Sequence, residues 1–311
     1  MVSASAPGKV ILFGEHAVVY GEPSLVAGID KRVYVDAEKK GDRISIASDV
    51  GSSSFSLDEI GLPAQDELRY VKKAVELVFK RVDKRTGLEI NITSEVPSAS
   101  GLGSSASVSV ATILAVSKLF DADLTLKEIA ELGHRVELEV QGAASPTDSS
   151  VATFGGVLFI QPTEKKVDSI EADLSLIIGY TGVERSTKVL VERVKSLRDR
   201  YPGIVDPIIQ DIGRLTREAR TRLERGDDVG DLMNVNHGLL EALGVSTEQL
   251  SRAVHAARDA GARGAKLTGA GGGGCMIALA PNHQVEVTRA IEASGCSAIR
   301  ASLSRAGVRI E

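Results

Sequence analysis

Tryptophan is absent from this sequence, aromatic residues make up only 4% of it, and cysteine occurs twice in 311 residues. Cys275 and Cys296 are too few for a disulfide framework and lack metal-ligand spacing, so we expect both to be small buried apolar residues. No apolar run is long enough to span a bilayer, and the stretch MVSASAPGKVILFGEH lacks the charged start and apolar core of a signal peptide. We therefore expect a cytoplasmic protein with no membrane partner.

An excess of basic residues is also missing. Lys and Arg number 37 against 42 Asp and Glu, which gives a formal net charge of -5. A general nucleic-acid binder needs a basic face to release counterions from phosphates, so we expect no nucleic-acid partner. The chain is about twice a typical domain length, so we expect two domains with a cleft between them.

The hydrophobic pattern of the first half mixes strand and helix periods. Alternating apolar residues predict strands around Val33 to Ala37 and Leu88 to Ile92. A helix of small residues is expected from Ser104 to about Leu119. A capping box, Thr125 to Glu128, opens the helix that follows.

The second half shifts to long amphipathic helices, expected at 187–200, 206–225, 229–243 and 247–260. Strand-like segments flank them, at Val157 to Ile160 among others. Because strands and helices mix without strict βαβ alternation, we predict a two-domain α+β fold. The expected division gives an N-terminal domain of residues 1–153 and a C-terminal domain of residues 154–311.

The 31 glycines are bunched, and one bunch lies in PSASGLGSSA at 97–106. Backbone amides at a helix start are unpaired, and glycine lets a loop wrap phosphate oxygens without side-chain clashes, so the segment is a candidate phosphate loop. The same residues also suit an ordinary turn and helix cap. No GxxxxGK[ST] string occurs, so this is not a Walker A loop. Its GxGxxA string, with Asp121 or Asp123 roughly twenty residues on, leaves a dinucleotide-binding interpretation open.

A second bunch lies in KLTGAGGGGC at 266–275, directly before an expected strand. Four consecutive glycines cost backbone entropy unless some group must approach the backbone closely. That group is either a ligand or another part of the protein in a tightly packed turn.

Three segments taken together resemble the GHMP kinase superfamily: PGKVILFGEH at 7–16, PSASGLGSSA at 97–106 and KLTGAGGGGC at 266–275. The superfamily is named for galactokinase, homoserine kinase, mevalonate kinase and phosphomevalonate kinase. Within it, PGKVILFGEHAVVYG, SPTDSSVATFGG and VERSTK are similar to the mevalonate kinases in particular, whereas Tyr20 replaces the His that many relatives carry. The resemblance implies an N-terminal domain like ribosomal protein S5 domain 2, a C-terminal ferredoxin-like α+β domain, and ATP in the cleft between them.

The resemblance also implies roles for individual residues. Asp148, expected in a short polar loop, would be the catalytic base for the substrate hydroxyl, and Lys9 would help to activate that hydroxyl and stabilise the transferring phosphate. The ATP phosphates are expected against Pro97, Ser98, Ala99, Ser100, Gly101, Leu102, Gly103, Ser104 and Ser105. The substrate pocket is expected to include Glu15, His16, Arg185 and Thr187. A loop closing over the phosphates and substrate is expected to include Lys266, Gly269, Gly271 and Gly272.

Mg²⁺, bound with ATP, is expected on the Ser105 hydroxyl and the Glu137 carboxylate, since hard oxygen ligands suit this ion. Glu139 is the competing carboxylate. If residues 126–140 are helical, the two side chains point about 200° apart around the axis, so only one can face the cleft. Spacing to Asp148 favours Glu137.

The activity implied by the resemblance is ATP-dependent phosphorylation of an alcohol, with ATP and mevalonate as partners. Another GHMP kinase with a different acceptor is the nearest alternative. A non-catalytic ATP-binding sensor would be expected to lack Lys9 or Asp148, and a nucleotide-dependent dehydrogenase depends on the GxGxxA string alone. A homodimer is open as well, because a long amphipathic helix could form an interface, although internal packing gives the same periodicity.

Overall fold

The computed structural model describes residues 1–64, 68–97, 100–142, 145–164, 166–183 and 186–311. The strands are β1 (Val2–Phe13), β2 (Ser24–Lys39), β3 (Arg43–Ser48), β4 (Gly51–Ser56), β5 (Leu88–Ser94), β6 (Val157–Gln161), β7 (Lys166–Ile170), β8 (Ser175–Tyr180), β9 (Gly264–Thr268), β10 (Cys275–Leu279), β11 (Ser297–Ser302) and β12 (Arg309–Ile310). The α-helices are α1 (Arg69–Val82), α2 (Ser104–Leu119), α3 (Leu126–Gln141), α4 (Thr147–Phe154), α5 (Thr187–Arg200), α6 (Pro202–Arg225), α7 (Gly230–Ala242), α8 (Glu248–Asp259) and α9 (Gln284–Ala293).

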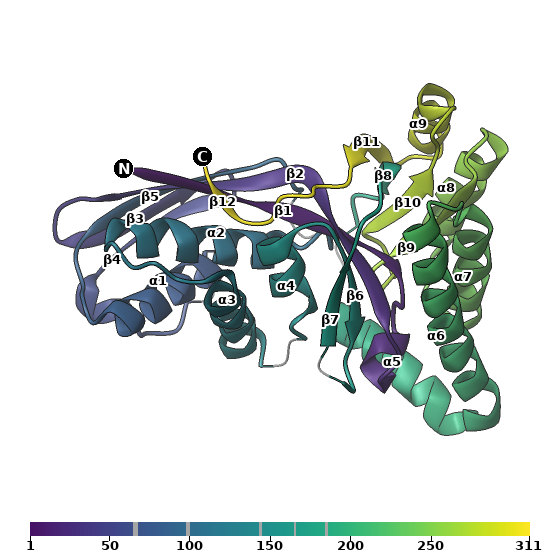
Figure 1. Cartoon of the computed structure of the whole chain (residues 1–311), viewed down its shortest axis with the longest axis horizontal. Helices are drawn as coiled ribbons and strands as arrows, with labels where there is room; N and C mark the ends of the chain where they lie inside the picture. Colours follow the sequence, from purple (N-terminus) through teal and green to yellow (C-terminus); the bar gives the residue numbers. More distant parts are fainter. Residues whose placement is uncertain (65–67, 98–99, 143–144, 165, 184–185) are drawn as a thin grey trace.

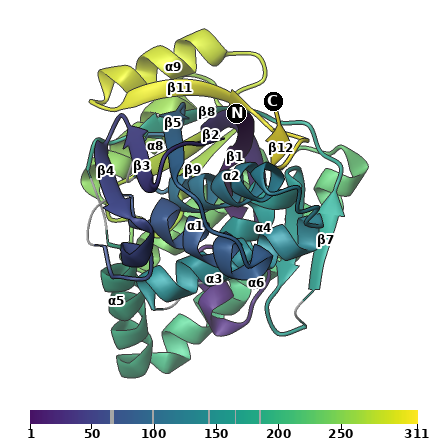
Figure 2. The same cartoon turned by 90° about the vertical axis from the view of Figure 1, so that its left-hand side faces the viewer.

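The first sheet has the strand order β12-β1-β2-β5-β3-β4, and β6 and β7 extend it from β2. Its pairs are antiparallel except β3 with β5. Helices α1 to α4 lie on one face of this sheet (Figures 1 and 2). The predicted helix from Ser104 to Leu119 is confirmed as α2, which packs between the sheet and its neighbouring helices because its residues are small or apolar nearly all round.

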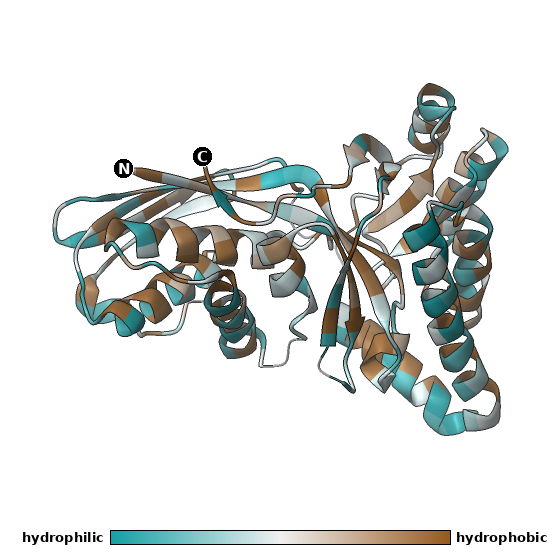
Figure 3. Cartoon of the chain, viewed as in Figure 1, coloured by the Kyte–Doolittle hydropathy of each residue, from teal (hydrophilic) through white to brown (hydrophobic). Residues whose placement is uncertain are grey.

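The second sheet is antiparallel with the order β11-β8-β10-β9. Helices α7, α8 and α9 pack on it with apolar residues and turn hydrophilic residues outward (Figure 3). The four predicted amphipathic helices are confirmed as α5 to α8. Helix α6 begins at Pro202, four residues earlier than predicted, because proline is well suited to the first helical position. Of the helices described, none is long and apolar enough to cross a membrane.

The predicted division after residue 153 does not coincide with the sheets. Strands β6 and β7 follow that point, yet β6 pairs with β2 in the first sheet. Strand β12, at the end of the chain, pairs with β1. The first sheet therefore takes strands from both sides of residue 153, and the chain returns to it after β11.

The returning C-terminal segment is held by the buried guanidinium of Arg32. Its Nη2 donates to the Gly307 carbonyl at 2.7 Å and its Nη1 to the Ala306 carbonyl at 3.2 Å. The Val308 amide then donates to the carbonyl of Thr153, near the end of α4, at 3.1 Å. The last residues of the chain thus fix the C-terminal end of α4.

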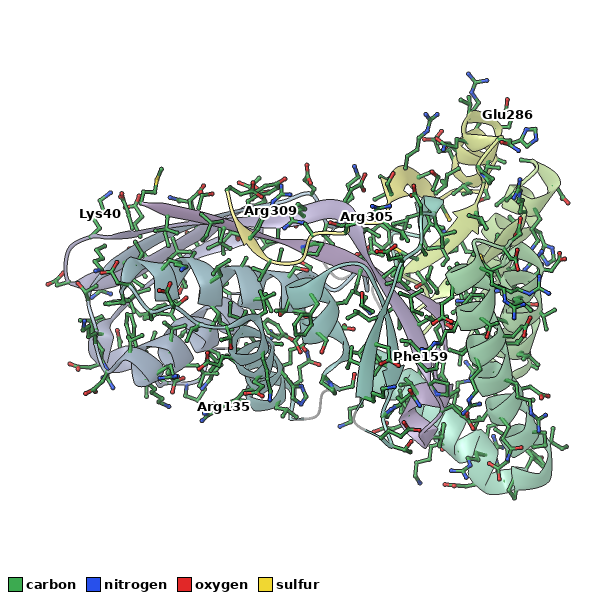
Figure 4. The ribbon with its side chains drawn as sticks, in the orientation of Figure 1. Lys40, Arg135, Phe159, Glu286, Arg305 and Arg309 are labelled. Atoms are coloured by element: carbon green, nitrogen blue, oxygen red, sulfur yellow. The ribbon has the colours of Figure 1, made fainter. Side chains whose placement is uncertain are left out.

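Helix α6 contacts β6 and β7 of the first sheet, and so links the part of the molecule built on the first sheet to the part built on the second. The Arg220 guanidinium lies 4.6 Å from the ring centre of Phe159 on β6, which Figure 4 labels between the two parts. Arg220 also donates to Asp168 on β7 at 3.2 Å, and Arg217 donates to Glu22 at 2.8 Å. These contacts orient the second sheet and its helices against the first.

Candidate active site

Strand β1 brings the three motif segments together. The Lys9 amide donates to the Leu102 carbonyl at 2.8 Å, which attaches the loop at 100–103 to the strand. Two residues on, the Ile11 amide donates to the Thr268 hydroxyl at 2.9 Å, and that hydroxyl donates back to the Ile11 carbonyl at 2.9 Å. Both glycine-rich segments are therefore hydrogen-bonded to one strand, at Lys9 and at Ile11.

The loop before α2 is shaped by its own side chains and ends on the first turn of the helix. The Ser100 hydroxyl donates to the Pro97 carbonyl at 2.7 Å. Gly103 takes the left-handed φ of 79° and precedes the first helical residue, so the next amides lack partners within the helix. Ser104 and Ser105 are partly exposed at this helix start. Ser98 and Ala99 lie outside the described residues.

Lys9 and Asp148 form an ion pair beside this loop. Lys9 Nζ lies 3.2 Å from Asp148 Oδ1, and the two side chains are 8% and 32% exposed. The expectation that Asp148 lies in a loop was wrong, because it occupies the first turn of α4. Pro146 precedes that turn with φ −70°, a value close to the helical one. A carboxylate open to solvent thus lies against a nearly buried cation.

Glu137 is the carboxylate of α3 that faces this pair. The Thr125 capping box is confirmed, and the helix it opens buries Glu137, whose Oε2 has no hydrogen-bond partner. Burial, reinforced by the negative charge of Asp148 and opposed by Lys9, raises the pKa of Glu137 to about 8.

Glu139 lies on the other side of α3. It accepts from Arg135 at 2.6 Å and pairs with Lys73 at 3.2 Å, and these contacts lower its pKa. Figure 4 shows Arg135 at the edge of the molecule. The helical geometry thus separates the two carboxylates as predicted, with Glu137 toward Asp148.

Glu15 and Lys266 are not at a surface where a ligand would meet them. Both side chains are fully buried and form an ion pair with each other. Burial lowers the pKa of Lys266, and Glu15 opposes that shift. Lys266 was expected in a loop closing over the phosphates and substrate, and this was wrong, because Lys266 lies on β9 with its side chain buried. The Glu15 carboxylate faces Lys266 and Asn236. A pattern of single residues could not indicate that pairing, because the partners are far apart in the chain.

His16 directly follows Glu15 and adopts a left-handed backbone with φ 60°. Its Nε2 donates to the Ala270 carbonyl at 2.9 Å, so the histidine contacts the segment at 266–275. Thr187 is exposed at the start of α5, and Arg185 lies outside the described residues.

The glycine run at 271–274 packs against the protein itself. A side chain at Gly272 would come within 2.7 Å of Leu190, and one at Gly273 within 2.9 Å of the Val183 carbonyl. The Gly272 amide donates to the Val245 carbonyl at 2.8 Å. The tightly packed turn, one of the two interpretations left open above, accounts for these glycines, and the Gly272 amide is already engaged.

Comparison with known proteins identifies relatives over the full length. Residues 69–156 match the family model described as the GHMP kinases N terminal domain, and residues 217–296 match the GHMP kinases C terminal model. The chain is 49% identical to the mevalonate kinase of Thermococcus sibiricus, over 100% of this chain and 98% of that one.

Solved structures agree with these relatives. The mevalonate kinase of Methanococcus jannaschii superimposes with a TM-score of 0.88 at 32% identity, over 97% of this chain and 98% of that one. The L. major mevalonate kinase, in complex with R-mevalonate, gives 0.83 at 28% identity, over 97% and 96% of the two chains. The chain therefore belongs to the GHMP kinase family, as a relative of the archaeal mevalonate kinases.

Proposed function

We propose that this protein is a mevalonate kinase, which converts ATP and (R)-mevalonate to ADP and (R)-5-phosphomevalonate. The observation that carries the proposal is the contact of Lys9 with Asp148 at 3.2 Å, beside a helix start suited to phosphate. Family membership supports the phosphoryl donor, and the full-length similarity to mevalonate kinases supports the acceptor.

Asp148 is the group that accepts the proton of the acceptor hydroxyl. As the hydroxyl O–H bond breaks, the oxygen forms a bond to the γ-phosphorus of ATP, and the bond to the bridging oxygen of ADP breaks. Lys9 adds a positive charge where negative charge spreads over the transferred group. Asp148 suits this role because its carboxylate is partly exposed, whereas the Lys9 side chain beside it is nearly buried.

The start of α2 binds the phosphates in this proposal. Its unpaired amides and the positive end of the helix dipole favour anionic oxygens. Ser104 and Ser105 are exposed enough there to donate hydroxyl hydrogen bonds. The Gly272 amide donates to a protein carbonyl and is not free for a phosphate oxygen. In this proposal the segment at 266–275 therefore contributes its backbone shape and its contact with His16.

Mg²⁺ fits the residues present, and we propose Glu137 and Ser105 as its protein ligands. The buried Glu137 Oε2 lacks a partner, which is costly for a carboxylate unless a cation approaches it. In the described part of the chain no three His, Cys, Asp or Glu side chains form a metal site. One carboxylate and a hydroxyl, completed by nucleotide oxygens and water, is the ligand set Mg²⁺ commonly takes, and the ion would neutralise phosphate charge.

The acceptor is tested by ADP release from ATP and Mg²⁺ with mevalonate, phosphomevalonate, homoserine, shikimate and galactose. We expect turnover with mevalonate alone. Turnover confined to another acceptor would keep the phosphate site and reject the substrate, and no turnover with any acceptor would favour an ATP-binding sensor. ATP with Mg²⁺, but not NAD, is expected to raise the temperature of unfolding.

Gly103→Ala is expected to reduce kcat by roughly tenfold or more, because misplaced catalytic groups lose that much with small shifts. A methyl group at this position would lie 2.7 Å from Cγ of Lys9 and displace its ammonium from Asp148. Gly142→Ala is the matched control, since Gly142 has a similar φ of 80° with no atom within 4 Å of the added methyl. Both variants should lose about 1 kcal/mol of stability from backbone strain. Equal kcat values for the two would reject the placement of Lys9.

A further inference from the structure

A fully buried ion pair joins the two parts of the molecule. Glu15 follows β1 of the first sheet and Lys266 lies on β9 of the second, and neither side chain is exposed. Asn236 on α7 donates to the second Glu15 oxygen at 3.1 Å, and Lys266 also donates to the Leu267 carbonyl at 2.7 Å. Lys266 on β9 and Asn236 on α7 therefore converge on the carboxylate carried by the segment after β1.

Stability alone is a weak reason for such a pair. Removing two charges from water costs several kcal/mol per ion, and replacing a buried pair by apolar residues is often neutral or stabilising. The pair does, however, require that its donors and acceptors meet in one geometry. It therefore fixes the position of the end of β1 relative to β9.

Two further contacts join the same segments. Thr268 exchanges two hydrogen bonds with Ile11. His16 donates to the Ala270 carbonyl and holds a left-handed backbone that non-glycine residues seldom adopt. The segments at 11–16 and 266–270 are thus locked at three points, and Glu15 with Lys266 is the fully buried one.

We propose that Glu15 and Lys266 are positioning residues, which hold His16 and the loop at 269–272 in place for the acceptor without touching either substrate. The inference rests on the proposed function, since it assigns His16 and this loop to the acceptor side of the site. It replaces the direct ligand roles expected for Glu15 and Lys266 from the sequence.

The test compares Lys266→Met, Glu15→Gln and the double variant in thermal unfolding and steady-state kinetics. Lys266→Met should lower the unfolding temperature most, because it leaves the Glu15 carboxylate buried without a cation. The double variant should regain most of that loss. We expect its kcat/KM for mevalonate to stay roughly tenfold to a hundredfold below wild type, as displaced binding groups do, while KM for ATP changes less than about threefold.

A stable double variant with wild-type kcat/KM would overturn the proposal, since the pair would then serve stability alone. If the double variant does not fold, Glu15→Gln decides in the same way, because Lys266 retains the Leu267 carbonyl as an acceptor. Glu76→Gln is the matched control: it neutralises a carboxylate on α1 that is 7% exposed and paired with Lys73, outside the site. Its kcat/KM should match wild type.

Hydrogen exchange separates this inference from the proposed function. The Gly272 and Gly274 amides donate to the Val245 and Val183 carbonyls, so their exchange reports on the loop without any substrate. If the wild-type protein turned over no acceptor, the proposed function would fail and exchange alone would decide. Faster exchange in the double variant than in Glu76→Gln supports the positioning role, and unchanged exchange overturns it.

Discussion

Asp148→Asn is expected to lower kcat by about 10²- to 10⁴-fold, which is the range that a positioned general base contributes. The amide has nearly the same volume but cannot take the proton of the acceptor hydroxyl. The variant should keep the wild-type fold, because Asp148 is partly exposed and the interaction lost is its ion pair with Lys9. Protection against thermal unfolding by ATP with Mg²⁺ should therefore stay close to wild type.

Asp231→Asn is the control for this substitution, since Asp231, which is exposed, also lies in the first turn of a helix, α7. It should leave kcat and protection by ATP unchanged. Near-wild-type turnover of Asp148→Asn would remove Asp148 as the base. A loss of ATP protection with the loss of turnover would instead show that Asp148 helps to bind the nucleotide.

Sequence patterns predicted the features that depend on neighbouring residues, namely the ends of helices and the side of a helix on which a residue lies. The limits of α2 followed from the glycine turn and the small residues after it, and the start of α3 followed from the Thr125 box. Helical geometry then required Glu137 and Glu139 to face opposite sides, and the structure has one buried beside Asp148 and the other on the surface. Each of these predictions used only residues within a few turns of one another.

Contacts between distant segments could not be predicted in this way. The pairing of β6 with β2 depends on which strand edge is open once the sheet has formed. The alternation of apolar residues in a strand does not specify which strand it pairs with. Arg32 gave no sign that its guanidinium would hold residues 306 and 307. Glu15 and Lys266 were each assigned to a ligand, because in isolation a charged residue in a motif has no other evident partner, whereas in the fold they neutralise each other.

Glu137→Gln is expected to stabilise the metal-free protein at alkaline pH and to leave it nearly unchanged at acidic pH. The pKa of Glu137 rises from the ordinary 4.5 to about 8 in the folded state. Below both values the carboxyl is protonated in folded and unfolded chains alike. Between them only the unfolded chain loses the proton, so wild-type stability falls as the pH rises from about 5 to about 8. One pKa unit corresponds to about 1.4 kcal/mol, so the difference between variant and wild type should grow by a few kcal/mol.

Urea unfolding of the metal-free proteins across this pH range measures the difference, and Glu139→Gln is the matched control. Glu139 is partly exposed and its pKa is lowered, so its loss should cost at most about 1 kcal/mol and add no alkaline stabilisation. In turnover, Glu137→Gln should be the more harmful substitution. It should raise the Mg²⁺ concentration needed for half-maximal rate far more than Glu139→Gln does. A larger Mg²⁺ requirement in Glu139→Gln would move the ligand to that residue, and equal pH profiles of stability would mean that Glu137 is not held protonated in the folded protein. If both of these contrary results were found, Glu137 would not be a Mg²⁺ ligand. A buried carboxyl group that exchanges its proton for Mg²⁺ must show both a pH-dependent effect on stability and an effect on the Mg²⁺ requirement.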